Sequence, residues 1–318
     1  MKTYTRRQFT KIALAAIPAV GAISTFASRA SAAGAGKVNS KVNGVQIGLN
    51  VPYSFGGRVM NGDEILANCL QVGVNGLELR TQAVELFLGA PAAILASGRG
   101  AANNATALRD WRAKADPKRA VEFRKKYEDA GMKIEILKLD NTYSLADAEL
   151  DYVFTLAKSL GARAISTEIA AIDDEAKRNV DHKRLAGFAD RHEVYVGIHG
   201  HEKVTPDHWE AAISLSKYMG INLDLGHFIA GNNYSPIDYL KKRHDRITHI
   251  HVKDRKKNMG PNVPFGEGDT PVVEALRLMR DNKWTFQATI EFEYPVPAGS
   301  DRMAEITKSV KFCRDALA

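Results

Sequence analysis

The chain has 318 residues, a formal net charge of +7 and two cysteines. This length suits one barrel-sized domain and is tight for two sizeable domains. No low-complexity linker and no internal repeat with a period of roughly 20 to 50 residues is present, which argues against a repeat architecture. Much of the excess positive charge lies near the N-terminus, so the basic composition does not indicate nucleic-acid binding by the rest of the chain.

A twin-arginine motif stands near the start of the chain, at Thr5-Arg-Arg-Gln-Phe-Thr-Lys11. A short alanine-rich apolar stretch (12–27) and the small-residue sequence Ala30-Ser31-Ala32 follow it, as in a cleaved export signal. The stretch is short and contains a proline and a glycine, which disfavours the alternative of a retained membrane anchor. We predict a signal peptide over residues 1–32, recognised by the twin-arginine export machinery, and a periplasmic or secreted mature protein.

Cleavage at this point would lower the formal charge from +7 to +2, because it removes five basic residues and no acidic residue: Lys2, Arg6, Arg7, Lys11 and Arg29. A nearly neutral mature chain gives little reason to expect a nucleic-acid partner. The two cysteines, Cys69 and Cys313, lack a CxxC spacing. We expect two buried free thiols; a disulfide between the first and last helices is the alternative in an oxidising compartment.

From residue 45 onward, short β-type apolar runs alternate with longer stretches that have apolar residues at helical spacing. Eight strands are predicted, at Val45–Val51, Gly76–Arg80, Lys133–Leu137, Ala164–Glu168, Val194–His199, Ile221–Asp224, Ile247–Val252 and Phe286–Glu291. Helices are predicted at Gly62–Gln71, Lys118–Ala130, Leu145–Leu160, Glu175–Arg191, Thr205–Tyr218, Pro236–His244 and Pro271–Asp281. This pattern predicts an α/β fold, a (β/α)8 TIM barrel over residues 45–318, preceded by a flexible segment over 33–44.

Local signals support several of these boundaries. Thr205-Pro206-Asp207 places a capping hydroxyl before a first-turn proline and an acid, and three glycines are each expected to follow a helix and precede a strand: Gly131, Gly161 and Gly220. The connection after the second strand, Thr81–Asp116, is too long for an ordinary loop. It could form a lid over the barrel mouth or a peripheral insertion.

Metal-type ligands stand at the ends of successive predicted strands: Glu168, His199 with His201, Asp224 with His227, His249 with His251, and Glu291 with Glu293. In a parallel barrel these strand ends converge on one mouth, where mixed carboxylate and imidazole ligands can hold a divalent metal. The chain is therefore predicted to be an enzyme with a metal ion in the mouth of the barrel.

The spacing of these residues along each predicted strand indicates which side chains point into the barrel. His249, His251 and Lys253 alternate along one strand, so all three would point into the barrel, where they need partners. Inward-facing Glu291 and Glu293 would repel each other unless a cation lies near them; the alternative places both outward, salt-bridged at the helix layer.

Other groups have more than one interpretation. Asp224 and His227 could face one cavity, or Asp224 could cap a helix beside a surface histidine. His199 and His201 could be metal ligands, hydrogen-bond donors to substrate or proton shuttles. The basic run over residues 253–257, which includes Lys257, could hold an anionic or hydroxyl-rich substrate or form a solvated loop.

Three motifs carry a resemblance to a known family: Leu223-Asp224-Leu-Gly-His227, His249-Ile-His251-Val-Lys253-Asp254 with Gly266-Glu-Gly268 downstream, and Ile290-Glu-Phe-Glu293-Tyr294. From about Val45 onward the chain resembles the xylose isomerase-like barrel superfamily of sugar phosphate isomerases and epimerases. That superfamily also includes inosose dehydratases, keto-sugar 3-epimerases, dehydroshikimate dehydratases and, more distantly, the endonuclease IV group.

Relatives bind one divalent ion, commonly manganese, cobalt or magnesium, through a carboxylate after the fifth strand, an aspartate after the sixth, a histidine after the seventh and a glutamate after the eighth. The resemblance implies Asp224, His251 and either Glu291 or Glu293 as ligands. This chain departs at the fifth strand, where Gly197-Ile-His199-Gly-His201 replaces the usual glutamate. The fourth ligand stays open between Glu168, His199 and His201.

We assign roles on this basis. The predicted metal ligands are Glu168, Asp224, His251 and Glu293. Zinc is also compatible with this set of ligands. The predicted catalytic residues are Glu168, His199, Glu291 and Lys253. The predicted substrate-binding residues are His201, His227, His249, Lys257 and Glu78.

The resemblance implies chemistry on a sugar carbonyl. A divalent ion can stabilise the enediolate that forms when a base removes the proton beside a carbonyl, which leads to isomerisation, epimerisation or elimination. Because sugar phosphates are largely intracellular, an exported member is predicted to act on an unphosphorylated keto-sugar or 3-keto-glycoside. The alternative is a non-catalytic periplasmic sugar-binding protein on the same fold; either could form a homo-oligomer.

Overall fold

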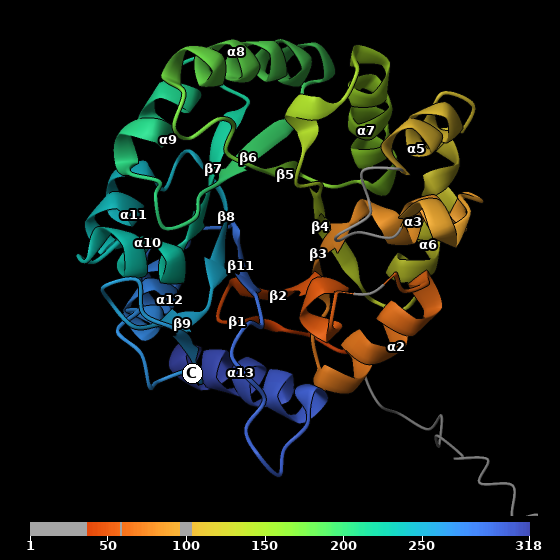
Figure 1. The fold of residues 1–318 in the computed structure, drawn as a ribbon. Helices are drawn as coiled ribbons and strands as arrows, with labels where there is room; N and C mark the ends of the chain where they lie inside the picture. Colours follow the sequence, from red (N-terminus) through yellow and green to blue (C-terminus); the bar gives the residue numbers. More distant parts are fainter. Residues whose placement is uncertain (1–36, 58, 96–103) are drawn as a thin grey trace, which may run out of the picture. The chain divides into compact units, whose positions relative to one another are not determined.

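Eight parallel strands close into a barrel in the computed structural model, which describes residues 37–57, 59–95 and 104–318. Each strand pairs with the next along the chain, and the last pairs with the first (Figure 1). The barrel strands are β2 (Val45–Val51), β3 (Gly76–Arg80), β4 (Lys133–Lys138), β5 (Ala164–Glu168), β6 (Tyr195–His199), β7 (Met219–Asp224), β8 (Ile247–Val252) and β11 (Gln287–Ile290). The predicted (β/α)8 barrel is confirmed.

Helices surround the barrel as an outer ring (Figure 1). They are α2 (Gly62–Val72), α3 (Thr81–Phe87), α4 (Ala92–Leu95), α5 (Ala105–Arg112), α6 (Ala120–Asp129), α7 (Asp147–Leu160), α8 (Glu175–His192), α9 (Pro206–Ile213), α10 (Leu225–Asn232), α11 (Ile237–Arg243), α12 (Val272–Asp281) and α13 (Arg302–Leu317). Short elements complete the fold: β1 (Lys41–Val42), β9 (Asp254–Arg255), β10 (Asn262–Val263), η1 (Tyr53–Phe55), η3 (Pro117–Arg119) and η4 (Thr142–Ser144).

Most predicted boundaries agree with the structure to within a few residues, and α9 is the main exception. It ends at Ile213 rather than Tyr218, and β7 begins at Met219, so Gly220 lies inside the strand rather than between a helix and a strand. By contrast, Gly161 follows α7 with φ of 68°, the left-handed conformation in which glycine commonly ends a helix. The predicted signal peptide lies outside the described residues.

The connection between β3 and β4 is helical rather than an open loop. It contains α3, α4 and α5, and Arg112 of α5 is buried between two carboxylates. Its Nε lies 2.7 Å from Glu85 of α3, and its Nη1 lies 3.2 Å from Glu149 of α7. This buried ion-pair group ties α5 to the helix layer. A lid function for the connection stays a prediction.

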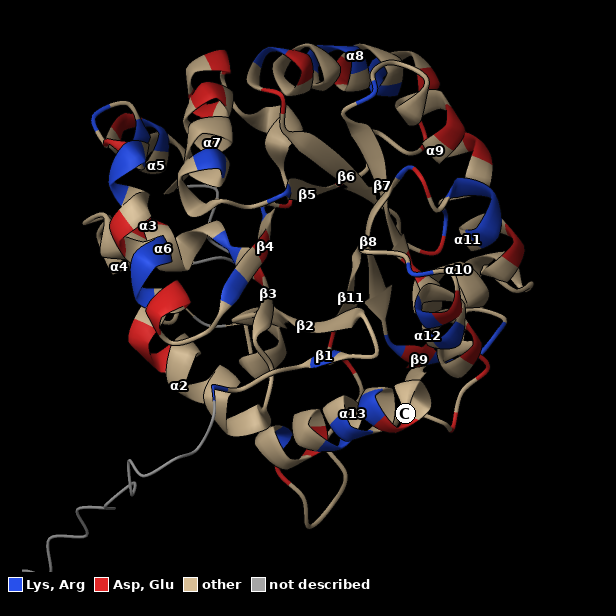
Figure 2. Cartoon of the chain, turned by 180° about the vertical axis from the view of Figure 1, so that it is seen from behind, with Lys and Arg blue, Asp and Glu red and all other residues tan. Residues whose placement is uncertain are grey.

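None of the helices in the described part of the chain is long and apolar enough to cross a bilayer. Basic and acidic side chains are mixed along the outer helices rather than separated by sign (Figure 2). Cys69 and Cys313 are both buried and free, as expected.

We expect Arg112→Met to lower the free energy of unfolding by about 3–5 kcal/mol, because it leaves Glu85 and Glu149 buried without their cation. Chemical denaturation measures this change. Arg109→Met, on the same helix with a side chain that is 52% exposed, is the matched control and should have little effect. Equal losses in the two variants would contradict the assignment.

Candidate metal centre at the barrel mouth

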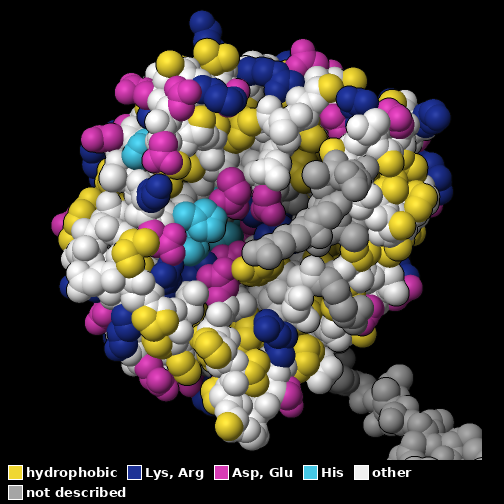
Figure 3. All heavy atoms as spheres, in the orientation of Figure 1, with side chains coloured by type: hydrophobic (Ala, Val, Ile, Leu, Met, Phe, Trp, Pro, Cys, Tyr) yellow, Lys and Arg dark blue, Asp and Glu magenta, His cyan; other side chains and the backbone are white. Residues whose placement is uncertain are grey.

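The carboxyl ends of the strands place acidic and imidazole side chains around one hollow. Figure 3 shows these groups gathered at the centre of the face that Figure 1 presents. Four of them, His199, Asp224, His251 and Glu291, are buried and offer ligand atoms that all lie within 4.8 Å of one another. We call these four residues the quartet. They come from the ends of β6, β7 and β8 and from the residue after β11.

Each histidine of the quartet is held by a carboxylate on its far side. Nε2 of His251 lies 2.7 Å from Oε2 of Glu78, and Nδ1 of His199 lies 2.8 Å from Oε2 of Glu168. Burial opposes ionisation of Glu78, but His251 and His249 hold the pKa of its carboxyl well below the usual value. Carboxylates in this position commonly fix the orientation of metal-binding histidines.

The two carboxylate oxygens of Asp224 have different roles: one caps a helix and the other faces the cavity. Oδ1 accepts the backbone N–H of His227 at 2.8 Å and so caps α10, whereas Oδ2 lies 3.3 Å from Nε2 of His199 and 3.5 Å from Nδ1 of His251. Asp224 therefore both faces the cavity and caps a helix, but His227 is buried rather than a surface histidine. Burial opposes ionisation of Asp224, but His227 and Lys253 hold its pKa well below the usual value.

Lys253 supplies the positive charge inside this acidic hollow. Its ammonium group lies 2.9 Å from Asp224, 2.5 Å from Glu291 and 2.7 Å from Glu293. Burial opposes the charge, but these carboxylates raise the pKa of Lys253 well above its usual value. Gly226 leaves room for the lysine stem, because a Cβ there would overlap Cγ of Lys253.

The quartet fits a divalent cation on two observations. Nδ1 of His251 is buried without a hydrogen-bond partner among the described residues, and it faces Asp224 and Glu291, whose Oε2 lies 3.3 Å away. The three carboxylates around Lys253 also leave an excess of negative charge, which a bound cation would neutralise. Two imidazoles and two carboxylates suit manganese, cobalt or zinc and are compatible with magnesium.

A second group of polar residues borders the quartet at the surface. The side chain of His201 is 56% exposed, and its Nε2 lies 2.9 Å from Oε2 of Glu168. His227 lies beside it, with ring centroids 4.5 Å apart. Nδ1 of His227 lies 3.1 Å from Glu202 and 2.7 Å from Nη1 of Arg255.

The structure thus separates residues that the sequence grouped together. His199 and Glu291 belong to the quartet. Glu168 and Glu293, which were predicted as ligands, lie outside it: Glu168 pairs with His199, His201 and Lys138, and Glu293 pairs with Lys253 and Tyr53. The outward alternative for the two glutamates is wrong, because both contact Lys253.

Three predicted substrate-binding residues have other surroundings. His249 is fully buried, with Nε2 3.5 Å from Glu78, and Glu78 itself is fully buried behind His251. Neither side chain is accessible from the mouth in this structure. Lys257 is exposed, and its backbone N–H binds Asp269. Of the basic run, Lys253 and Arg255 are the buried members.

Three site residues were given no role in the sequence analysis: Tyr53, Lys138 and Glu202. The Tyr53 hydroxyl donates to Glu293 at 2.7 Å, and Nζ of Lys138 donates to Glu168 at 2.7 Å. Both follow or end a predicted strand, which was an available signal. Burial, together with Glu293, raises the pKa of Tyr53, so its hydroxyl stays protonated.

The motif that follows β8 positions its loop. Oδ2 of Asp254 accepts the backbone N–H groups of Gly266 and Gly268 at 2.8 and 2.9 Å, and Oδ1 accepts that of Thr270 at 3.1 Å. A side chain at Gly268 would overlap Asp254. The Lys253-Asp254 pair thus directs one side chain to the quartet and the other to the loop that borders it.

Comparison with known proteins identifies the family of this fold. The model of the xylose isomerase-like TIM barrel family matches residues 99–316. The chain belongs to this family. No curated protein sequence matches it significantly.

Solved structures show the same fold at low sequence identity. A probable 3-DHS dehydratase involved in petrobactin synthesis from Bacillus anthracis has a TM-score of 0.59 at 17% identity, with 84% of this chain and 98% of that chain covered. A family member from Mycobacterium smegmatis in complex with magnesium has a TM-score of 0.57 at 16% identity, covering 86% and 96%. A D-tagatose 3-epimerase-like protein has a TM-score of 0.57 at 12% identity, covering 86% and 97%.

We expect Lys253→Met to lower the free energy of unfolding of the metal-free protein by about 3–5 kcal/mol, because three carboxylates then lose their shared cation. Denaturant titration in the presence of a chelator measures this. The control, Lys256→Met, changes the exposed basic residue three positions later and should have almost no effect. A Lys253→Met protein as stable as the control would refute the role of this ammonium group.

Proposed function

We propose that this protein is a metal-dependent isomerase, epimerase or lyase that acts on an unphosphorylated carbohydrate with a carbonyl group, a keto-sugar or 3-keto-glycoside, through an enediolate. The quartet carries the proposal, because its two histidines are both oriented by carboxylates behind them. We further propose that the twin-arginine motif directs the protein to the periplasm or outside the cell, where unphosphorylated sugars are available.

One divalent ion, manganese, cobalt, magnesium or zinc, would bind His199, Asp224, His251 and Glu291. When bound, it would supply Lewis acidity that stabilises negative charge developing on a carbonyl oxygen of the sugar. Among relatives of the same fold, the Mycobacterium smegmatis protein was solved with magnesium, which supports a cation at this barrel mouth. The pairing of Glu78 and Glu168 with the histidines keeps both rings in place for this role.

Two groups beside the quartet would handle protons and charge. Nε2 of His201 is engaged by Glu168, which leaves Nδ1 as the ring nitrogen that can take up or return a proton at the open side of the mouth. Lys253 would donate a hydrogen bond to developing negative charge, held in position by Glu291 and Glu293.

Charge pairing supports a neutral substrate rather than a sugar phosphate. Lys138, Lys253 and Arg255 surround the quartet, and each already contacts a carboxylate: Glu168, Glu291 and Glu202 respectively. A phosphate would need to displace one of these internal partners. Dehydratase and epimerase names among the structural neighbours support chemistry beside a carbonyl without choosing between the outcomes.

The test is exchange of the proton beside the sugar carbonyl with deuterium from solvent, followed by NMR on a panel of keto-sugars with the metal-loaded protein. We expect exchange by the wild type and a loss of about 10²–10⁴-fold in His201→Gln, the range for a general acid or base. His244→Gln, which changes an exposed histidine between α11 and β8, is the matched control and should keep the wild-type rate.

The competing hypothesis is a sugar-binding protein without catalysis. Binding of the same sugars by calorimetry with no exchange by the metal-loaded wild type would favour it. Equal exchange rates in wild type and His201→Gln would instead retain an enzyme but remove His201 from the proton transfer.

A further inference from the structure

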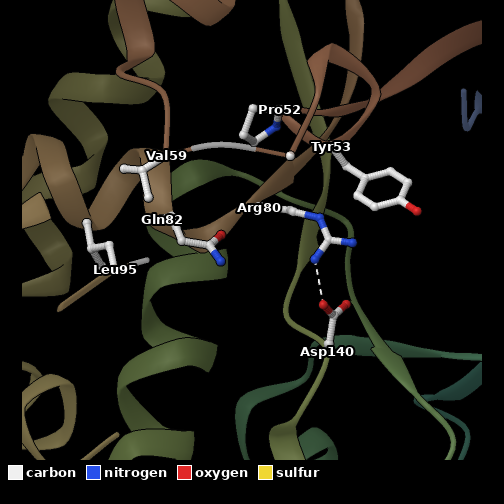
Figure 4. Close-up of a pocket in the computed structure, with 8 residues that line it drawn as sticks. Pro52, Tyr53, Val59, Arg80, Gln82, Leu95 and Asp140 are labelled. Atoms are coloured by element: carbon white, nitrogen blue, oxygen red, sulfur yellow. Dashed lines mark hydrogen bonds and ion pairs between the residues drawn. The ribbon is translucent and has the colours of Figure 1, made fainter. Parts of the chain in front are cut away.

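A pocket of about 210 Å³ lies beside the quartet, between the segment after β2 and the segments after β3 and β4 (Figure 4). No role in the chemistry described so far uses it. Its volume is below the roughly 300–1,000 Å³ of pockets that enclose a whole drug-sized ligand. It therefore suits one part of a ligand whose remainder lies elsewhere.

The polar wall of this pocket is made by Arg80, Gln82 and Asp140. Arg80 lies between Gln82 and the Tyr53 ring, and its Nη1 donates to Asp140 at 2.6 Å (Figure 4). Because this ion pair neutralises the guanidinium charge, the wall is a poor site for a phosphate or carboxylate. It remains well suited to neutral hydrogen-bonding groups.

Three buried atoms of this wall lack hydrogen-bond partners among the described residues: Nε of Arg80, Oε1 of Gln82 and Oδ1 of Asp140. Oδ1 of Asp140 is ion-paired with Nζ of Lys138 at 3.4 Å, which leaves Nε of Arg80, a donor, and Oε1 of Gln82, an acceptor, as the unpartnered pair. Buried polar atoms in native proteins are almost always satisfied, by protein, water or ligand. A hydroxyl group both donates and accepts, so the hydroxyls of a sugar match this pair.

The rest of the lining is largely apolar and includes Pro52, Tyr53, Val59 and Leu95. The Tyr53 ring also covers the Arg80 guanidinium, with its centroid 4.9 Å from Cζ. A lining that combines apolar and hydrogen-bonding groups fits a pyranose ring, which has C–H faces and a hydroxyl edge. A small ion would leave the apolar lining without a contact.

Tyr53 connects this pocket to residues that border the quartet. Tyr53 and Gly57 also line a second hollow of about 450 Å³, which contains His227 and Glu293. The Tyr53 hydroxyl donates to Glu293, and Glu293 contacts Lys253. One ligand could therefore extend from the quartet past Tyr53 into the pocket.

We propose that the pocket formed by Tyr53, Arg80, Gln82 and Asp140 is a subsite for a second, neutral sugar ring, so that the substrate is a disaccharide or larger glycoside rather than a single sugar. The subsite rests on the proposed function, because the first ring is placed at the quartet.

Calorimetry on the manganese-loaded protein tests the subsite with four ketoses. D-Fructose supplies one ring; lactulose, palatinose and turanose carry the same ketose with a second hexose at three different positions. We expect at least one disaccharide to bind about tenfold more tightly than D-fructose, as expected for one or two added hydrogen bonds. Gln82→Leu should remove this advantage and leave D-fructose affinity unchanged, whereas Gln71→Leu, on the exposed surface of α2, should change neither affinity.

Val59→Trp provides a second variant that fills the pocket from its apolar lining without removing a polar group. It should also lose the advantage of the disaccharide while retaining D-fructose. The subsite is overturned if no disaccharide binds more tightly than D-fructose, or if both variants weaken the two sugar classes equally. Disaccharide preference without solvent exchange would support the subsite and refute the proposed function. Solvent exchange without disaccharide preference would support the proposed function and refute the subsite.

Discussion

Burial of negative charge at the barrel mouth is the constraint on which the rest of the site depends. Asp224, Glu291 and Glu293 converge on the single ammonium group of Lys253. Burial opposes protonation of His199 and His251, but neighbouring carboxylates raise the pKa of both imidazoles, which shows how strongly this poorly solvated cavity favours positive charge. The fold therefore creates a place where an added cation is strongly stabilised, and the imidazoles of His199 and His251 complete its surroundings.

The contacts behind the quartet fix the positions of its side chains. Glu78 and Glu168 hold the histidine rings, and one oxygen of Asp224 is fixed by the first turn of α10 while the other faces the cavity. Asn50, in β2, donates a hydrogen bond from Nδ2 to Oε1 of Glu291 at 2.8 Å and so fixes this carboxylate. These supports lie on β2, β3, β5 and α10, whereas the quartet comes from the ends of β6, β7, β8 and β11, so the site exists only when the barrel is closed. Stability of the barrel and geometry of the site are thus coupled.

Much of this arrangement was predictable from periodicity in the sequence. Along Ile247–Val252 the period of two places His249 and His251 on the inner face, and the convergence of parallel strand ends brings distant ligands together.

The sequence did not predict which of several neighbouring polar side chains would enter the quartet. Glu168 and His199 are paired across β5 and β6, so either could have entered the cavity. Glu291 and Glu293 are two residues apart, so strand alternation places both on the same face and does not decide between them. Tyr53 and Gln82 lie beyond strand ends without a neighbouring acid or histidine motif, and only the tertiary structure relates them to the site.

Metal content of the purified protein tests the central claim most directly. Mass spectrometry after reconstitution with manganese or cobalt should find near one divalent ion per chain in the wild type and in His244→Ala, which changes an exposed histidine, and almost none in His251→Ala. Absence of metal from the wild type, or its full retention in His251→Ala, would contradict the account of the barrel mouth as a metal centre.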